Sequence, residues 1–143
     1  MGGVNFPVAL KKSVFRNRKK KIHMRIMLVE DNDIFRETFK EELLGRLHST
    51  IVKEAANGEE VIQKLNGFAP QIIFMDLNLP GENGFQLTQK IKAQFPNVRI
   101  ALLTSFDFPE CRQAAVQYGA ERYFVKDSFS WDEIEEFIKG HSA

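Results

Sequence analysis

The stretch 71–81 constrains the fold of this chain more than any other part of its sequence. Four apolar residues, 72–75, run directly into Asp76, and Leu79-Pro80-Gly81 predicts a turn just beyond that acid. A short apolar run that ends at proline and glycine is typical of a strand buried on both faces. We expect Asp76 at the carboxyl end of that strand, on the edge of a sheet where open α/β folds bind ligands.

Short apolar runs alternate with helical patterns from residue 25 onward. In the first helical pattern, Phe35, Phe39, Leu43 and Leu47 are four positions apart and form one apolar face. Such alternation indicates βα units and a parallel sheet. The five expected strands are residues 25–29, 50–55, 72–75, 99–104 and 122–125.

The second expected strand, residues 50–55, is the least apolar of the five because Lys53 and Glu54 interrupt it. Charged residues favour the edge of a sheet, since they discourage pairing with a foreign strand. Placing this strand beside the first gives the order 2-1-3-4-5 of flavodoxin-like folds. The expected fold is therefore an α/β three-layer sandwich with a five-stranded parallel sheet and five helices.

Charge divides the chain into a basic arm and an acidic body. Seven of the 20 Lys and Arg residues and none of the 19 acids lie in residues 1–23, which leaves a net charge of about −6 on residues 24–143. We interpret residues 1–23 as a disordered extension or leader. The acidic body is long enough for one domain and gives no indication of a nucleic-acid-binding face.

Two further expectations concern the location of the protein. The apolar stretch 4–10 is far too short to span a membrane, so no membrane insertion is expected. The single cysteine, Cys111, excludes a disulfide framework and favours a cytoplasmic location.

Polar residues at the ends of other expected strands supply partners for Asp76. Glu30-Asp31 follows the first strand, Thr104 ends the fourth and Lys126 follows the fifth. In a parallel sheet these ends lie at one edge, and oxygen ligands without Cys or His suit Mg²⁺. A carboxylate beside Mg²⁺ can attack phosphorus, while an ammonium and a hydroxyl stabilise the phosphoryl oxygens.

With these residues in this order, the sequence resembles the receiver domain of bacterial two-component response regulators. The resemblance covers essentially all of residues 24–143. Each motif alone is weak, but their succession on consecutive strands is highly specific. The motifs are Glu30-Asp31, Met75-Asp76-Leu77-Asn78-Leu79-Pro80-Gly81 with Gly84, Thr104-Ser105 and Tyr123-Phe124-Val125-Lys126.

The resemblance implies a signalling switch rather than an enzyme that acts on a separate substrate. Asp76 would accept a phosphoryl group from a sensor histidine kinase or a phosphotransfer protein. Mg²⁺ would be bound by the side chains of Asp31 and Asp76, by Glu30 through water and by the backbone carbonyl of Asn78.

The resemblance also assigns the residues that would respond to the phosphoryl group. Thr104 and Lys126 would bind it, and Tyr123 would swing inward as Thr104 is drawn toward the phosphate. A homodimer through the fourth helix, the fifth strand and the fifth helix is a further implied possibility.

The sequence departs from many receivers after the lysine, where Asp127-Ser128 stands in place of a proline. That variant looks like receivers of the NarL/FixJ (LuxR-type) class, which precede a helix-turn-helix output domain. We therefore expect regulation of transcription through an output domain absent from this chain, which is either a stand-alone receiver or one excised from a longer protein. The first acid is also Glu30 rather than aspartate, which alters its reach.

Two other functions stay open on the sequence. An aspartate-nucleophile phosphatase would need a second aspartate two residues after the nucleophile, but Asn78 stands there and cannot donate a proton in that role. A phosphate-independent scaffold with the same site is the other alternative. A dinucleotide-binding domain is excluded because no G-x-G-x-x-G follows the first strand.

Overall fold

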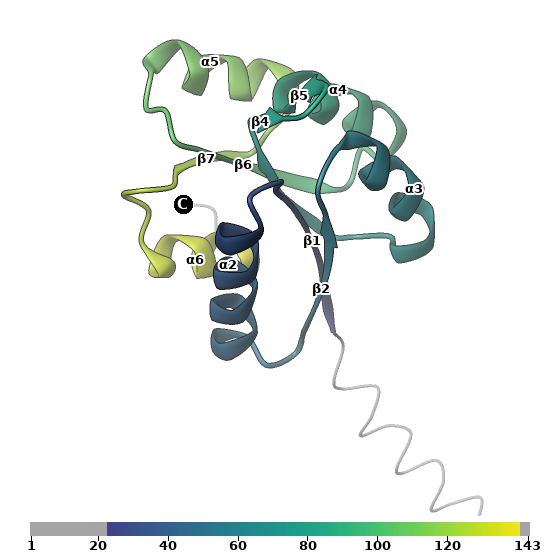
Figure 1. Cartoon of the computed structure of the whole chain (residues 1–143), viewed down its shortest axis with the longest axis vertical. Coiled ribbons are helices and arrows are strands. Elements are labelled where there is room, and N and C mark those ends of the chain that lie inside the picture. Colours follow the sequence, from purple (N-terminus) through teal and green to yellow (C-terminus); the bar gives the residue numbers. More distant parts are fainter. Residues whose placement is uncertain (1–22, 141–143) are drawn as a thin grey trace, which may run out of the picture.

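A parallel sheet of five strands lies at the centre of the protein (Figure 1). The computed structural model describes residues 23–140, so the interpretation of residues 1–23 as an extension falls almost entirely outside the described residues. The sheet order is β2-β1-β3-β6-β7, which is the predicted order 2-1-3-4-5 when its strands are counted along the chain. The strands are β1 (Met24–Val29), β2 (Thr50–Ala55), β3 (Ile72–Asp76), β6 (Arg99–Thr104) and β7 (Arg122–Val125).

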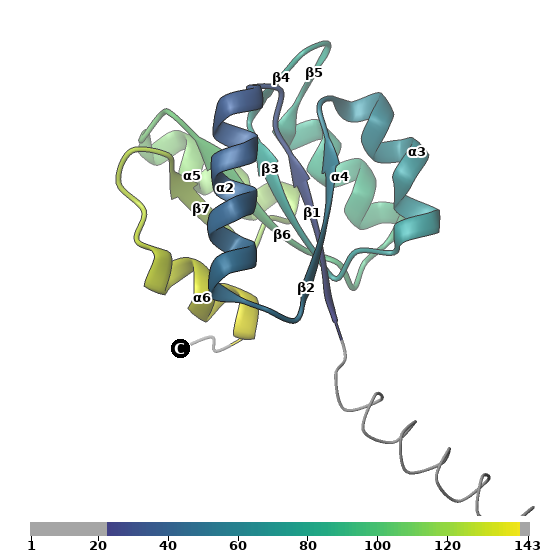
Figure 2. The ribbon, with the colours of Figure 1, turned by 60° about the horizontal axis from the view of Figure 1, so that its bottom comes forward.

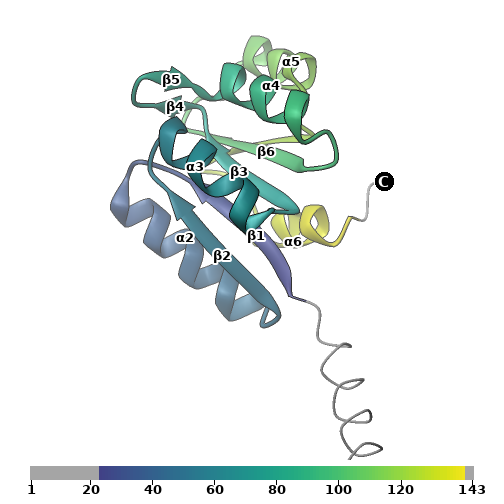
Figure 3. The same cartoon turned by 90° about the vertical axis from the view of Figure 1, so that its right-hand side faces the viewer.

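Helices cover both faces of the sheet, as predicted for a three-layer sandwich. In Figure 3, α2 and α6 lie on one side of the sheet and α3, α4 and α5 on the other. Figure 2 shows α2 and α6 side by side, and Arg46 on α2 pairs with Glu135 on α6. The helices are α2 (Asp33–Arg46), α3 (Gly58–Phe68), α4 (Gly84–Gln94), α5 (Pro109–Tyr118) and α6 (Trp131–Lys139).

The helices begin where the sequence provides caps. Asn32, Asn57 and Ser130 each accept a hydrogen bond from a backbone N–H in the first turn of α2, α3 and α6. These bonds satisfy N–H groups that have no partner within the helix. At α5 no side chain caps the helix, and Pro109 occupies the first turn instead.

The core has one apolar cluster on each face of the sheet, and β3 contributes to both. Phe74 of β3 packs against Phe39 of α2 and Phe137 of α6, with ring centroids 5.2 and 5.6 Å apart. Met75 lies in the opposite cluster with Leu87 of α4. All five residues of β3 are buried, which confirms the prediction of a strand buried on both faces.

The apolar residues 61, 62 and 65 predict one buried face for the helix α3, but one of the three is exposed. Ile62 of α3 is 48% exposed, whereas Val61 and Leu65 are buried. Successive helical residues are about 100° apart around the axis. The face that carries Val61 and Leu65 therefore turns Ile62 toward solvent.

A small hairpin follows β3 where the sequence predicts only a turn. Its strands are β4 (Asn78–Leu79) and β5 (Glu82–Asn83), which pair in antiparallel fashion. Gly81, in the tip of the hairpin, has a φ of 78°, a conformation that glycine adopts without steric cost. The hairpin returns the chain to Gly84, whose N–H donates to the carbonyl of Leu77 at 2.8 Å.

Gly84 packs directly on the backbone that follows Asp76. A Cβ at this position would lie 2.7 Å from the Asp76 carbonyl oxygen and 2.9 Å from Leu77 Cα. We predict that Gly84→Ala lowers the free energy of unfolding in urea by about 1–3 kcal/mol, because backbone must move to admit the methyl group.

Gly45 is the matched control for this substitution. It lies in α2, and a Cβ there meets no atom within 4 Å. Gly45→Ala should leave the free energy of unfolding equal or raise it by up to about 1 kcal/mol. Equal stability for Gly84→Ala and the wild type would contradict the tight packing of α4 on β3.

Candidate functional site

Asp76 is the last residue of β3 and points into a cluster of charged side chains at the carboxyl edge of the sheet. It is 5% exposed. Its Oδ1 accepts a hydrogen bond from the backbone N–H of Asn78 at 3.1 Å. Because β3 lies in the centre of the sheet, β1 and β6 flank Asp76 on either side.

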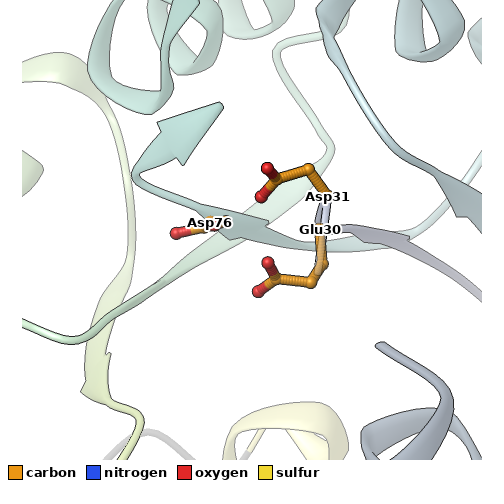
Figure 4. A group of neighbouring side chains, drawn as sticks. All are labelled: Glu30, Asp31 and Asp76. Carbon is orange, nitrogen blue, oxygen red and sulfur yellow. The ribbon is translucent and has the colours of Figure 1, made fainter. Parts of the chain in front are cut away.

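Three carboxylates converge at this edge. Each of Glu30, Asp31 and Asp76 offers an oxygen, and these atoms lie within 4.8 Å of one another. In Figure 4, the Glu30 and Asp31 carboxylates both point toward the Asp76 side chain. Glu30 is fully buried and Asp31 is exposed, so the cluster is closed by protein at Glu30 and accessible to solvent at Asp31.

Lys126 is the cation that faces this cluster. Its Nζ lies 2.6 Å from Glu30 Oε1 and 3.5 Å from Asp76 Oδ2. The residue follows β7, and its backbone N–H donates to the Thr104 carbonyl at 2.7 Å, which fixes the start of its side chain. The ammonium also lies over the ring of Phe35, 4.6 Å from its centroid.

Burial and repulsion make Glu30 unusually basic for a carboxylate. Burial raises the pKa of Glu30 to about 7, and the charge of Asp76 adds to this. Hydrogen bonds from Lys126 and from the Asn32 N–H act in the opposite direction. Apart from the ion pair with Lys126, Glu30 Oε1 accepts no hydrogen bond within the described residues.

The structure brings the other predicted site residues to the same edge, where they differ from one another in burial and in their hydrogen bonds. Thr104 is fully buried, and its Oγ1 accepts a hydrogen bond from the Phe106 N–H at 3.1 Å. Tyr123 OH donates to the Phe106 carbonyl at 2.6 Å. Burial raises the pKa of the Tyr123 phenol above its ordinary value. Asn78 is exposed in the hairpin beside Asp76.

Arg36 is a neighbour of the site that no sequence motif indicated. Its Nη1 donates to the backbone carbonyl of Glu30 at 2.6 Å. It lies at the end of the first turn of α2, where an arginine is ordinarily a solvated surface residue. The contact with the Glu30 carbonyl depends on how α2 is oriented relative to β1 and β2, which the sequence does not specify.

Comparison with known proteins identifies the family. The sequence profile described as the response regulator receiver domain matches residues 26–139. This chain belongs to that family. The result agrees with the motifs at the strand ends and with the order of the sheet.

Relatives of this receiver domain include regulators of the class expected from the sequence. It is 34% identical over 106 residues to the oxygen regulatory protein NreC of Staphylococcus aureus (strain JH9), which covers 73% of this chain and 49% of that protein. It is 29% identical over 120 residues to the transcriptional regulatory protein LnrK of Bacillus subtilis (strain 168), covering 84% of this chain and 54% of that protein. The chain thus spans about half the length of these relatives.

A solved structure shows the same fold. A two-component response regulator of the LuxR family from Aurantimonas sp. SI85-9A1 superposes with a TM-score of 0.75 at 32% identity. The match covers 82% of this chain and 86% of that one.

Within residues 23–140, the receiver domain has no helix that is long and apolar enough to cross a membrane.

The ion pair between Lys126 and Glu30 makes a testable contribution to stability. The two side chains are 14% and 1% exposed. Lys126→Met leaves buried carboxylates without their cation, so we predict a loss of roughly 3 kcal/mol in the free energy of unfolding without metal. Adding Glu30→Gln should recover part of this loss, with a coupling energy of about 1–3 kcal/mol in urea unfolding.

Lys90→Met is the control for loss of a surface ion pair. Lys90 pairs with Glu82, and its side chain is 63% exposed. The expected change is within about 0.5 kcal/mol, because exposed ion pairs are screened by water. A Lys126→Met variant as stable as Lys90→Met would show that Lys126 does not neutralise the acidic cluster.

Proposed function

We propose that this receiver domain is a phosphorylation switch in which Asp76 accepts the phosphoryl group. The observation that carries the proposal is the placement of a buried aspartate at the carboxyl edge of the sheet, between two further acids and one lysine. Buried acids are ordinarily paired or hydrogen-bonded for structural reasons. Here the acids outnumber the cation, which suits a site that takes up positive charge.

The residues present fit Mg²⁺. The acidic cluster offers only oxygen ligands, from Glu30, Asp31 and Asp76, and Asp31 leaves it open to solvent. Apart from its ion pair with Lys126, the buried Glu30 Oε1 has no partner among the described residues, so a lone pair would be left for a water molecule on the metal. The Asn78 carbonyl is the fourth proposed ligand. Bound Mg²⁺ would supply positive charge for the carboxylates and for the phosphoryl oxygens.

Asp76 is the proposed nucleophile. Its Oδ1 is held by the Asn78 N–H, and its Oδ2 faces Lys126. One carboxylate oxygen forms a bond to phosphorus while the bond from phosphorus to the donor breaks, and the leaving group keeps that electron pair. The Lys126 ammonium offsets the negative charge that the phosphoryl oxygens bring to the site.

The proposed readout passes through Thr104 and Tyr123. The Thr104 hydroxyl would turn from the Phe106 N–H to a phosphoryl oxygen, and Tyr123 would exchange its hydrogen bond to the Phe106 carbonyl for an inward position. Phosphorylation adds about −1.5 to −2 charges, which gives the hydroxyl a stronger partner.

We further propose the cellular setting of this switch. A sensor histidine kinase or phosphotransfer protein donates the phosphoryl group in the cytoplasm, and the domain of residues 24–143 controls transcription within a longer regulator. The names of its relatives, a transcriptional regulatory protein and a LuxR-family response regulator, support this role. A homodimer through α5, β7 and α6 is one means by which the switch would act.

Labelling with a small acyl phosphate tests the proposed function. With Mg²⁺ and acetyl phosphate, the wild type should gain the mass of one phosphoryl group in an intact-mass measurement. Asp76→Asn should gain none, and chelation of the metal should suppress labelling of the wild type, because charge neutralisation at the site is then incomplete.

Asp127→Asn is the matched control, since Asp127 is an exposed acid next to Lys126. It should be labelled like the wild type. Equal behaviour of wild type and Asp76→Asn would contradict the switch and favour a phosphate-independent scaffold. Turnover of a phosphate ester over many equivalents would favour a phosphatase instead.

A further inference from the structure

Arg36 connects the acidic edge of the sheet to strand β2. Its Nη1 donates to the Glu30 carbonyl at 2.6 Å, its Nη2 to Asp33 Oδ1 at 2.8 Å and its Nε to Glu54 Oε1 at 3.1 Å. Each nitrogen of the guanidinium group therefore donates a hydrogen bond, and each bond goes to a different residue. The planar fork of arginine permits this arrangement, and the single ammonium of lysine does not.

The far end of this connection is firmly held. Lys40 Nζ donates to Glu54 Oε2 at 2.9 Å, and Lys64 Nζ donates to the Glu54 carbonyl at 2.7 Å. The hydrogen bond from Lys40 lowers the pKa of Glu54, and the hydrogen bond from Arg36 adds to the effect against the opposing influence of burial. Glu54 is thus an ionised anchor at the carboxyl end of β2.

The near end fixes the peptide plane that joins the two acids of β1. The Glu30 carbonyl and the Asp31 N–H belong to one rigid plane. On the preceding plane, the Glu30 N–H donates to the Ala55 carbonyl at 2.9 Å. The Glu30 backbone is therefore held on both sides, by β2 directly and by β2 through Arg36.

Asp31 depends most on this plane. Within residues 23–140, no hydrogen bond or ion pair holds its carboxylate, in contrast to those of Glu30 and Asp76. Its direction therefore depends on the position of the Asp31 backbone and on the torsion angles of the side chain itself. A shift of the Glu30–Asp31 backbone would move the Asp31 carboxylate relative to Asp76.

We propose that Arg36 is a positioning residue for the divalent cation: it holds the Glu30–Asp31 peptide plane so that both carboxylates face Asp76. The inference rests on the proposed function insofar as that function places a metal ion among these acids. Arg36 does not touch the metal in this account. It acts through the backbone carbonyl of Glu30, as outer partners of metal ligands commonly do.

The charge of Arg36 and its hydrogen bond to the Glu30 carbonyl have opposite effects on the affinity for a cation, which makes the proposal testable. Loss of a positive charge near three carboxylates would by itself strengthen the binding of a cation. Loss of the clamp on Glu30 would weaken it. A variant that keeps the charge but lacks the fork, Arg36→Lys, separates the two effects.

The test is a titration with Mn²⁺ alone, followed by electron paramagnetic resonance, which reports binding without any phosphoryl transfer. Arg36→Gln should bind Mn²⁺ about tenfold more weakly than the wild type, and Arg36→Lys should also be weaker. The melting temperature without metal is measured in parallel, so that a loss of affinity is read only on folded protein.

Arg46→Gln is the matched control on the same helix. Arg46 also donates to two carboxylates, Glu42 and Glu135, but it makes no contact with the acidic cluster. Its removal should leave the Mn²⁺ affinity within about twofold of the wild type, while its effect on melting temperature should resemble that of Arg36→Gln.

Each outcome bears on one claim. Arg36 variants that bind Mn²⁺ like the wild type, or an Arg36→Gln variant that binds more tightly, would overturn the positioning role. A wild type that binds no Mn²⁺ would overturn it as well. A wild type that binds Mn²⁺ but is not labelled by acetyl phosphate would contradict the proposed function and leave the positioning role standing.

Discussion

The concentration of negative charge at one edge of the sheet is the constraint on which the rest of this site depends. Three carboxylates share a small volume, and Lys126 lies 2.6 Å from one of them and 3.5 Å from another. Such an arrangement is stable only while cations or protons compensate the charge. Burial, to which the charge of Asp76 adds, raises the pKa of Glu30 to about 7.

The fold meets this constraint with rigid elements. β3 is buried on both faces, so Asp76 has little freedom, and Gly84 lets α4 pack against the backbone just beyond it. Arg36 and Glu54 tie the end of β1 to β2. The parts that would respond to phosphorylation lie instead beyond β6, where Thr104 and Tyr123 share the Phe106 backbone as a hydrogen-bonding partner.

The sequence predicts those features that are encoded locally. The apolar run before Asp76 and the charged residues of β2 can be recognised from neighbouring residues, and the structure confirms the buried strand and the edge strand that they predict. The exposure of Ile62 and the hairpin after β3 depend on how each segment is turned in the fold.

The same distinction holds for the candidate site: its residues could be predicted from the sequence, but several of its contacts could not. Strand ends predict which residues meet at one edge, since a parallel sheet brings them together. They do not predict that Lys126 lies closer to Glu30 than to Asp76, or that Arg36 reaches the Glu30 carbonyl. These contacts are set by the direction of α2 and by the chain after β7, which no local pattern specifies.

A crystal structure with Mg²⁺ and beryllium fluoride, a mimic of the phosphoryl group, tests the central claim most directly. We predict that beryllium binds an Asp76 carboxylate oxygen. Lys126 Nζ should donate a hydrogen bond to a fluorine atom and lie farther from Glu30 Oε1 than the present 2.6 Å. Beryllium fluoride bound elsewhere, or Lys126 still paired with Glu30 beside an unmodified Asp76, would contradict it.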